Sequence, residues 1–139
     1  MSTTIPTHAT TTTTTPSVGS LLLTGSAAAV AAAVSAAAVA AVGQAVGITT
    51  NVGGAPIPTS GFAVLTLIFS VLGLGIGVAV RRFSGRPRVA WFRTTIALTV
   101  LSFVPDLLVD AAVTTKMLLM LTHVVAAAIV IPAVARRLS

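Results

Sequence analysis

Four long apolar stretches alternate with short polar segments along this chain. They cover about residues 20–46, 61–80, 94–110 and 116–135, and few charged side chains interrupt them. At a rise of 1.5 Å per residue, helices of these lengths cross most or all of a hydrocarbon core about 30 Å thick. The pattern therefore predicts an all-α fold, a bundle of four transmembrane helices formed by residues 19–139.

The first 18 residues differ from the rest, because they are rich in Thr and show no apolar periodicity. Such a segment buries too little apolar surface to offset the entropy of ordering, so we expect a disordered tail in which His8 is solvated. The apolar run that follows is too long for a signal peptide, and no basic residue precedes it. We expect an uncleaved first span.

The composition supports a membrane protein, with 55% hydrophobic and 7% charged residues. Soluble domains carry roughly 25% charged residues. The absence of Cys excludes disulfides, thiolate metal sites and thiol nucleophiles. Abundant Ala, together with Arg in large excess over Lys, is typical of high-GC genomes such as those of actinobacteria.

The arginines gather in two clusters, one between the second and third apolar stretches and one after the fourth. They are Arg81, Arg82, Arg86, Arg88, Arg93, Arg136 and Arg137. Cytoplasmic loops are enriched in Arg and Lys, so both clusters and both termini should lie on the cytoplasmic side of the cell membrane. Trp91 and Phe92 fit an interfacial aromatic belt. The net charge of +6 thus reflects topology, or binding of anionic lipid, and we expect no nucleic acid.

Small residues predict close helix packing. The first stretch is dominated by Ala, and Gly73 and Gly77 form a GxxxG pattern that lets helices approach within one chain or in a homo-oligomer. Gln44 could hydrogen-bond to a neighbouring helix or remain an interfacial amide in contact with water. Residues 49–60 contain Gly-Gly and two Pro residues, which predict a loop.

The third stretch repeats polar residues at steps of four, three, four and four. These residues are Thr95, Thr99, Ser102, Asp106 and Asp110. The spacing places them on one helix face, which should point into the bundle because lipid offers no hydrogen-bond partners. Pro105 cannot donate to the carbonyl of Leu101, which predicts a kink beside Asp106.

The fourth stretch adds Lys116 and His123 to this polar centre. With a turn centred near residue 113, Asp110 and Lys116 should face each other at the outer interface. Asp106 and His123 should then lie deeper and about 4–5 Å apart along the axes. We predict a hydrogen bond between them and coupled titration. The four residues could serve as a structural clamp or as a proton or ligand site.

The sequence assigns no catalytic residue. It contains no GxSxG, HExxH or P-loop pattern. One intramembrane His does not provide two haem ligands, and two carboxylates with one His are a weak metal signal. We therefore expect no cofactor, no metal and a non-enzymatic structural or interaction role in the membrane. The alternative is a small transporter or proton-coupled permease that uses Asp106 and His123.

One segment resembles a known family. It comprises Val104-Pro105-Asp106, Lys116 and residues 121–137, which carry His123 and end in Ile-Pro-Ala-Val-Ala-Arg-Arg. These residues resemble the actinobacterial four-helix membrane proteins grouped as DUF6069. The resemblance covers about residues 24–137 and implies four helices in a bacterial cell membrane. That family has no established activity, so the resemblance gives His123 no catalytic role.

Overall fold

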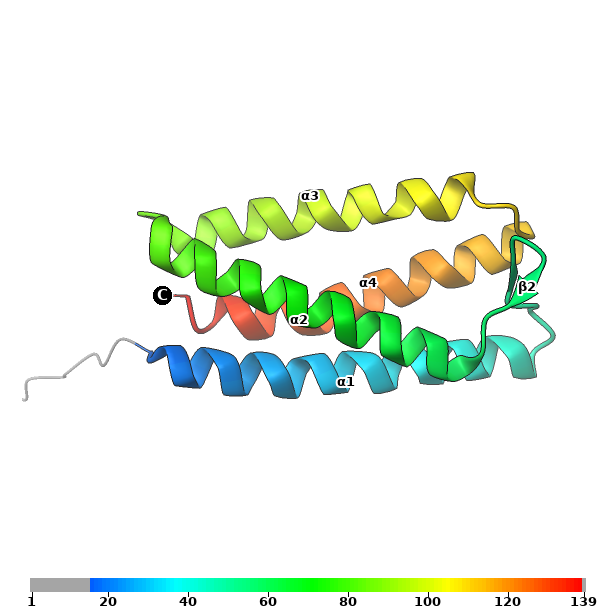
Figure 1. Ribbon diagram of the computed structural model, residues 1–139, viewed down its shortest axis with the longest axis horizontal. Coiled ribbons are helices and arrows are strands. Elements are labelled where there is room, and N and C mark those ends of the chain that lie inside the picture. Colours follow the sequence, from blue (N-terminus) through cyan, green and yellow to red (C-terminus); the bar gives the residue numbers. More distant parts are fainter. Residues whose placement is uncertain (1–15, 139) are drawn as a thin grey trace, which may run out of the picture.

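Four α-helices form the structure, a computed structural model that describes residues 16–138. They are α1 (Val18–Ala45), α2 (Thr59–Phe83), α3 (Pro87–Leu108) and α4 (Val113–Ala135). Helix α1 packs against α2 and α4, and α3 packs against α4 and α2 (Figure 1). All four are long and apolar enough to cross a membrane, judged by length and composition. The predicted all-α fold with four candidate spans is confirmed.

The first helix begins close to the start of the described residues. The side-chain oxygen of Ser17 accepts a hydrogen bond of 3.1 Å from the backbone N–H of Ser20, which caps the helix at Val18. Most of the tail expected over residues 1–18, including His8, lies outside the described residues. Ser17 and Val18 instead belong to the start of α1.

Helix α3 starts seven residues before the expected position of 94. Pro87 is its first residue. The N–H of a first helical residue has no partner within the helix, so proline loses no hydrogen bond there, and its fixed φ angle suits the helix. Helix α2 likewise continues to Phe83. As a result, only Arg86 lies in the connection between them, while Arg82 and Arg88 lie on the helices.

The expected loop over residues 49–60 contains a small β-hairpin. Strands β1 (Asn51–Val52) and β2 (Ala55–Pro56) pair antiparallel. Gly53 and Gly54 join them with φ angles of +57° and +82°, which glycine adopts without strain. The N–H of Gly53 donates to the carbonyl of Asp110 at 2.9 Å. This hydrogen bond attaches the hairpin to the α3–α4 connection.

The arginines gather at one end of the bundle, which we call the arginine end. The start of α1, the α2–α3 connection and the C-terminal residues meet there, whereas the hairpin and the α3–α4 connection form the opposite, hairpin end (Figure 1). Arg81 donates to the carbonyls of Pro16 and Arg137, the latter at 3.2 Å. Arg137 Nε donates to Thr24 Oγ1 at 3.1 Å. These bonds link α2 to the residues just before α1 and just after α4, and link the latter to α1.

Helix α1 supplies most of the tight packing through one face of small residues, the small-residue seam. Its buried members are Gly25, Ala28, Ala29, Ala32, Ala33, Ala36, Ala40 and Gly43. A Cβ atom added at Gly25 would collide with Leu74 of α2, and one at Gly43 would lie 2.8 Å from Leu118 of α4. The backbone of α1 therefore approaches both neighbours at glycines that the sequence analysis did not select.

The two glycines of the GxxxG pattern have different surroundings, since Gly77 lies inside the bundle and Gly73 has open space beside it. A Cβ at Gly77 would lie 3.2 Å from Val134 and 3.4 Å from Trp91, whereas nothing lies within 4 Å of one at Gly73. Trp91 is fully buried, and its Nε1 donates to the carbonyl of Ile131 at 3.0 Å. The ring of Trp91 therefore lies inside the bundle against α2 and α4, and not on the outer surface, where a residue of an interfacial aromatic belt would contact headgroups.

Candidate functional site between α3 and α4

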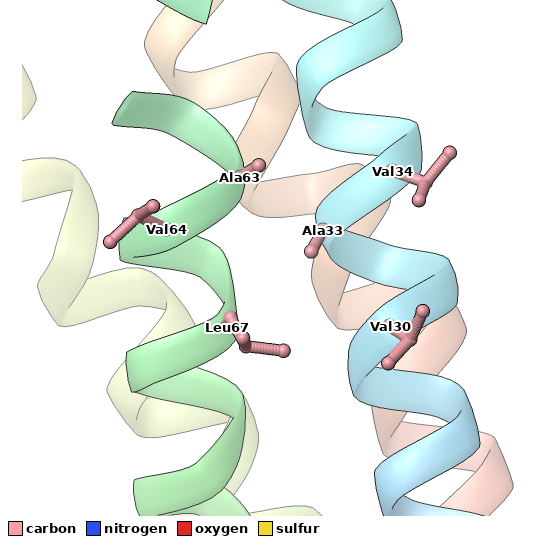
Figure 2. A pocket seen from close by; sticks show the side chains of 6 residues that line it. All are labelled: Val30, Ala33, Val34, Ala63, Val64 and Leu67. Carbon is pink, nitrogen blue, oxygen red and sulfur yellow. The ribbon is translucent and has the colours of Figure 1, made fainter. Parts of the chain in front are cut away.

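An apolar groove of about 200 Å³ lies between α1 and α2. It is lined by Val30, Ala33, Val34, Ala63, Val64 and Leu67 (Figure 2). None of these side chains can form a hydrogen bond or carry a charge. The groove therefore offers apolar contact only, and the polar chemistry of the bundle lies between α3 and α4.

The hydroxyl groups on the predicted polar face of α3 are used within that helix. Thr95 Oγ1 donates to the carbonyl of Trp91 at 2.8 Å, Thr99 Oγ1 to that of Thr95 at 2.8 Å, and Ser102 Oγ to that of Thr99 at 2.7 Å. Such bonds satisfy each hydroxyl without a partner helix. Asp106, farther along the same face, is therefore the residue that contacts α4.

Asp106 and His123 lie together, as the spacing predicts. Asp106 Oδ2 is 3.0 Å from His123 Nδ1. The carboxyl side chain is 10% exposed and the imidazole 38% exposed. No described residue donates a hydrogen bond of good geometry to Oδ2, so the structure shows the predicted proximity of the two side chains but not the predicted hydrogen bond. The buried acid thus depends on a partner that is itself partly on the surface.

The imidazole is oriented by its own helix as well as by Asp106. His123 Nδ1 lies 3.0 Å from the carbonyl oxygen of Leu119, one turn earlier on α4. A carbonyl oxygen only accepts hydrogen bonds, so this distance favours a proton on Nδ1. Phe103 of α3 meets the ring edge-on, with centroids 6.4 Å apart and planes at 81°. Both contacts leave Nε2 without a hydrogen bond to any described residue.

The pair meets although the turn lies earlier than expected. Asp106 is two residues from the end of α3, and His123 is ten residues into α4, an offset of eight residues or about 12 Å along the axis. Val109 and Ala112 are extended, with ψ angles of 147° and 150°. Residues 109–111 lie in bends, so the four-residue connection spans less than the roughly 14 Å of a fully extended segment. The connection still places the start of α4 beyond the end of α3 (Figure 1), which brings the two side chains level.

Asp110 and Lys116 do not form the expected outer pair. Lys116 Nζ donates instead to the carbonyl of Leu107 at 2.8 Å. Helix α3 ends at Leu108, so Asp110 is exposed beyond it and lies off the polar face. The last carbonyls of a helix lack partners within it, and a lysine nearby satisfies one of them. We call Asp106, Lys116 and His123, the residues that join α3 to α4, the polar seam.

Gln44 takes part in a separate cluster at the hairpin end. Its Nε2 donates to Thr50 Oγ1 at 3.2 Å, and its Oε1 accepts from Thr59 Oγ1 at 3.3 Å. Thr115 Oγ1 of α4 donates to the carbonyl of Thr49 at 2.6 Å. Gln44 thus hydrogen-bonds to the neighbouring helix α2, but as an acceptor, while its own N–H donates to the connection. The cluster fixes the connections and brings no ionisable group to the polar seam.

At the arginine end, six arginines are exposed. Besides Arg137, they are Arg82, Arg86, Arg88, Arg93 and Arg136. The hydrogen bonds already described engage Arg81 and Arg137 with the chain itself. The other five exposed arginines form the basic surface that any anionic partner at this end would meet.

Comparison with known proteins identifies a family. The model of the family described as "Family of unknown function (DUF6069)" matches residues 16–139. The chain belongs to this family. The matched range includes all four helices and both residues of the Asp106–His123 pair. Searches of curated proteins and of solved structures found no match. The family carries no assigned activity, so any function must be argued from the geometry.

Two contributors to the site escaped the sequence analysis, namely Phe103 and the carbonyl of Leu119. Both could have been found from helical spacing. Phe103 precedes Asp106 by three residues and Leu119 precedes His123 by four, so Phe103 lies on the same helix face as Asp106, and Leu119 on the same face as His123. A search for polar residues alone overlooks such neighbours.

Proposed function

We propose that this chain is a multi-pass protein of an actinobacterial cell membrane with a non-enzymatic structural or interaction role. One observation carries the proposal: many large apolar side chains lie exposed on the outside of the helices, while α1 buries a face of small residues. Phe69 is 65% exposed and Leu101 61% exposed, whereas the Ala face of α1 is buried. Water would penalise that surface by roughly 25 cal/mol per Å², and lipid would not.

In the proposed orientation the arginine end and both termini are cytoplasmic. This orientation is supported by the gathering of the arginines at one end, since cytoplasmic segments are enriched in basic residues. A reporter active only in the periplasm should give high activity when fused after residue 54, in the hairpin, and low activity after residue 86. High activity at residue 86 would contradict the orientation.

The exposed arginines are proposed to bind anionic lipid headgroups. Each basic residue near a charged leaflet contributes on the order of 1 kcal/mol. Residues 82–93 should therefore be better protected from protease in anionic than in zwitterionic vesicles. Equal protection would leave the arginines a role in topology alone.

A homo-oligomer through the exposed side of α2 is a further part of the proposal. Gly73 has open space beside it, so a second helix could approach there. Chemical crosslinking in native membranes should then trap a dimer in the wild type that is lost in Gly73→Leu. A crosslinking pattern unchanged by this substitution would exclude an interface at Gly73.

Within this role the polar seam is proposed to fix α3 against α4. Asp106 and His123 supply one link, and Lys116 with the carbonyl of Leu107 supplies the other. If they act as a clamp, Asp106→Asn and His123→Gln should weaken folding in detergent while the fold remains the same. Unfolding midpoints like those of the wild type would argue against the clamp.

The second candidate is a small transporter or proton-coupled permease. It is favoured by a buried carboxyl that meets a partly exposed imidazole, with the Lys116 ammonium bound one residue from Asp106. Here Asp106→Asn and His123→Gln should fold normally but lose pH-dependent flux in proteoliposomes. Normal folding together with unchanged flux would remove both interpretations of the pair.

A further inference from the structure

His123 lies near the middle of its helix. Ten residues separate it from Val113, the first residue of α4, and twelve separate it from Ala135, the last. These separations correspond to about 15 Å and 18 Å of helix. In the proposed membrane location, on which this step rests, the imidazole would therefore lie close to the centre of a core about 30 Å thick. A polar atom without a partner is most costly at that depth.

The hydrogen bonding of the imidazole leaves one nitrogen to be satisfied. The carbonyl of Leu119 and the carboxyl of Asp106 both lie 3.0 Å from Nδ1. With the proton of the neutral ring on Nδ1, Nε2 carries a lone pair and acts only as an acceptor. More than a third of this side chain is exposed on the outside of the bundle. The site thus needs a hydrogen-bond donor from outside the chain.

The chain itself does not bring a donor to this nitrogen. Lys116, the basic residue on the same helix, donates to the carbonyl of Leu107. A second copy that approached symmetrically at His123 would present another Nε2 acceptor, and two acceptors cannot form a hydrogen bond. The residues one turn away on the same face of α4, Met120 and Ala127, are apolar. A complementary partner is therefore apolar apart from its donor.

We propose that Nε2 of His123 accepts a hydrogen bond from the hydroxyl group of a lipid-soluble alcohol or phenol that lies against α3 and α4. The edge-on Phe103 ring and the apolar surface of α4 contact its body, and Leu119 and Asp106 keep the imidazole turned so that Nε2 faces it. Asp106 is a positioning residue in this site. Water carries the same O–H group, and the experiment distinguishes the two donors.

The first arm of the test determines which nitrogen carries the proton. The full chain with His8→Ala, labelled with ¹⁵N-histidine, is reconstituted in bicelles at about pH 8, above the usual pKa of an imidazole. We expect a protonated Nδ1 and an unprotonated Nε2 for His123. A proton on Nε2 under these conditions would overturn the proposal.

The second arm adds 4-hexylphenol, with 4-hexylanisole as the matched probe that lacks the O–H group. The phenol should shift the Nε2 resonance to saturation and leave Nδ1 almost unmoved. It should bind about tenfold more tightly than the anisole, as the net contribution of one hydrogen bond that replaces a bond to solvent provides. Equal shifts from both probes, or shifts that never saturate, would contradict the site. An Nε2 signal that responds to D₂O and to neither probe would assign the donor to water and overturn the proposal.

The third arm separates binding from folding. In His123→Asn the shorter amide retains a donor near the position of Nδ1 but has no group at the position of Nε2. Its thermal midpoint should stay close to that of the wild type, while saturable phenol binding falls by about tenfold or more. Asp110→Asn, exposed beyond α3, should bind the phenol normally. If His123→Asn binds as the wild type does, Nε2 is not the contact atom.

These arms fail independently of the proposed membrane role. The reporter fusions after residues 54 and 86 test the location and orientation without using His123. A normal reporter pattern with no phenol binding would therefore reject the ligand site alone. An inverted pattern would reject the orientation while the NMR result stood.

Discussion

Helix α4 contacts its two neighbours in different ways, through apolar packing on one side and through polar contacts on the other. Toward α1 it meets the small-residue seam, where Leu118 fills the space over Gly43. Toward α3 it meets the polar seam, where His123 contacts Asp106 and Lys116 contacts the carbonyl of Leu107. The first seam is apolar, and at Gly25 and Gly43 it leaves no room for an additional carbon. The second rests on a few hydrogen-bonding atoms and remains partly exposed.

The difference indicates which substitutions each seam tolerates. Added atoms should damage the small-residue seam, because close-packed backbones have no space to yield. Removed atoms should damage the polar seam, because a buried polar group without its partner costs more than the bond contributes. A hydrogen-bonding ligand finds a partner at the second seam, whereas the groove between α1 and α2 is lined by apolar side chains.

The largest effect is expected for Gly25→Val. Its branched side chain would collide with Leu74, a buried residue of the core, and should destabilise the bundle by about 3 kcal/mol. The change can be measured as the free energy of unfolding in mixed micelles. Adding Leu74→Ala should recover part of the loss, because it removes the atoms with which the new side chain collides.

The matched control is Gly75→Val on α2, a position with nothing within 4 Å. It makes the same chemical change on an open surface and should alter the free energy of unfolding by less than about 0.5 kcal/mol. Equal effects of the two substitutions would show that α1 does not approach α2 as closely as the structure has it.

The number of helices and the main polar contact could be predicted from the sequence. Both depend on local patterns, namely the length of apolar runs and the four-residue spacing that aligns Asp106 with the rest of its face. The proximity of His123 needed only the approximate depth of each residue in its helix. An error of two or three residues in the turn was absorbed by the partly extended connection.

The details that failed depend on contacts between helices or on the ends of helices. Gly25 and Gly43 lie within an Ala-rich run, and only the register of α1 against its neighbours distinguishes them from Gly73. Lys116 was assigned to Asp110 because α3 was expected to reach residue 110, and its end at Leu108 presents a carbonyl instead. Such ends shift easily by a few residues.

A smaller effect is expected for Asp106→Leu, which removes the carboxyl that contacts His123. The loss should be about 1–2 kcal/mol, since polar contacts between helices in membranes contribute less than their burial suggests. Asp110→Leu is the control and should be nearly neutral, because that side chain is exposed. The free energy of unfolding in mixed micelles measures both. If Asp110→Leu were the more harmful, the polar seam would be misassigned.

Trp91→Phe tests how α3 is held at the arginine end. It keeps most of the ring against Gly77 and Val134 but loses the hydrogen bond to the carbonyl of Ile131. We expect a loss of about 1 kcal/mol and a less protected N-terminal turn of α3 in hydrogen exchange. Unchanged protection would show that this bond does not restrain the helix.

The smallest effect is expected for Lys116→Met, which retains the apolar stem and removes the bond to Leu107. A partly exposed contact of this kind should contribute about 0.5 kcal/mol or less. Urea-induced unfolding in mild detergent should show almost the same midpoint as the wild type. A loss as large as that of Asp106→Leu would make Lys116 the main link between α3 and α4.

A double-mutant cycle between Asp106 and His123 tests the central claim that these residues form one interacting pair. The free energies of unfolding of the wild type, Asp106→Leu, His123→Phe and the double variant are compared under one condition. We predict that the double variant loses less than the sum of the two single losses, with a coupling of about 1 kcal/mol. Losses that add to within about 0.3 kcal/mol would show that the two residues act independently, and the polar seam as described would be wrong.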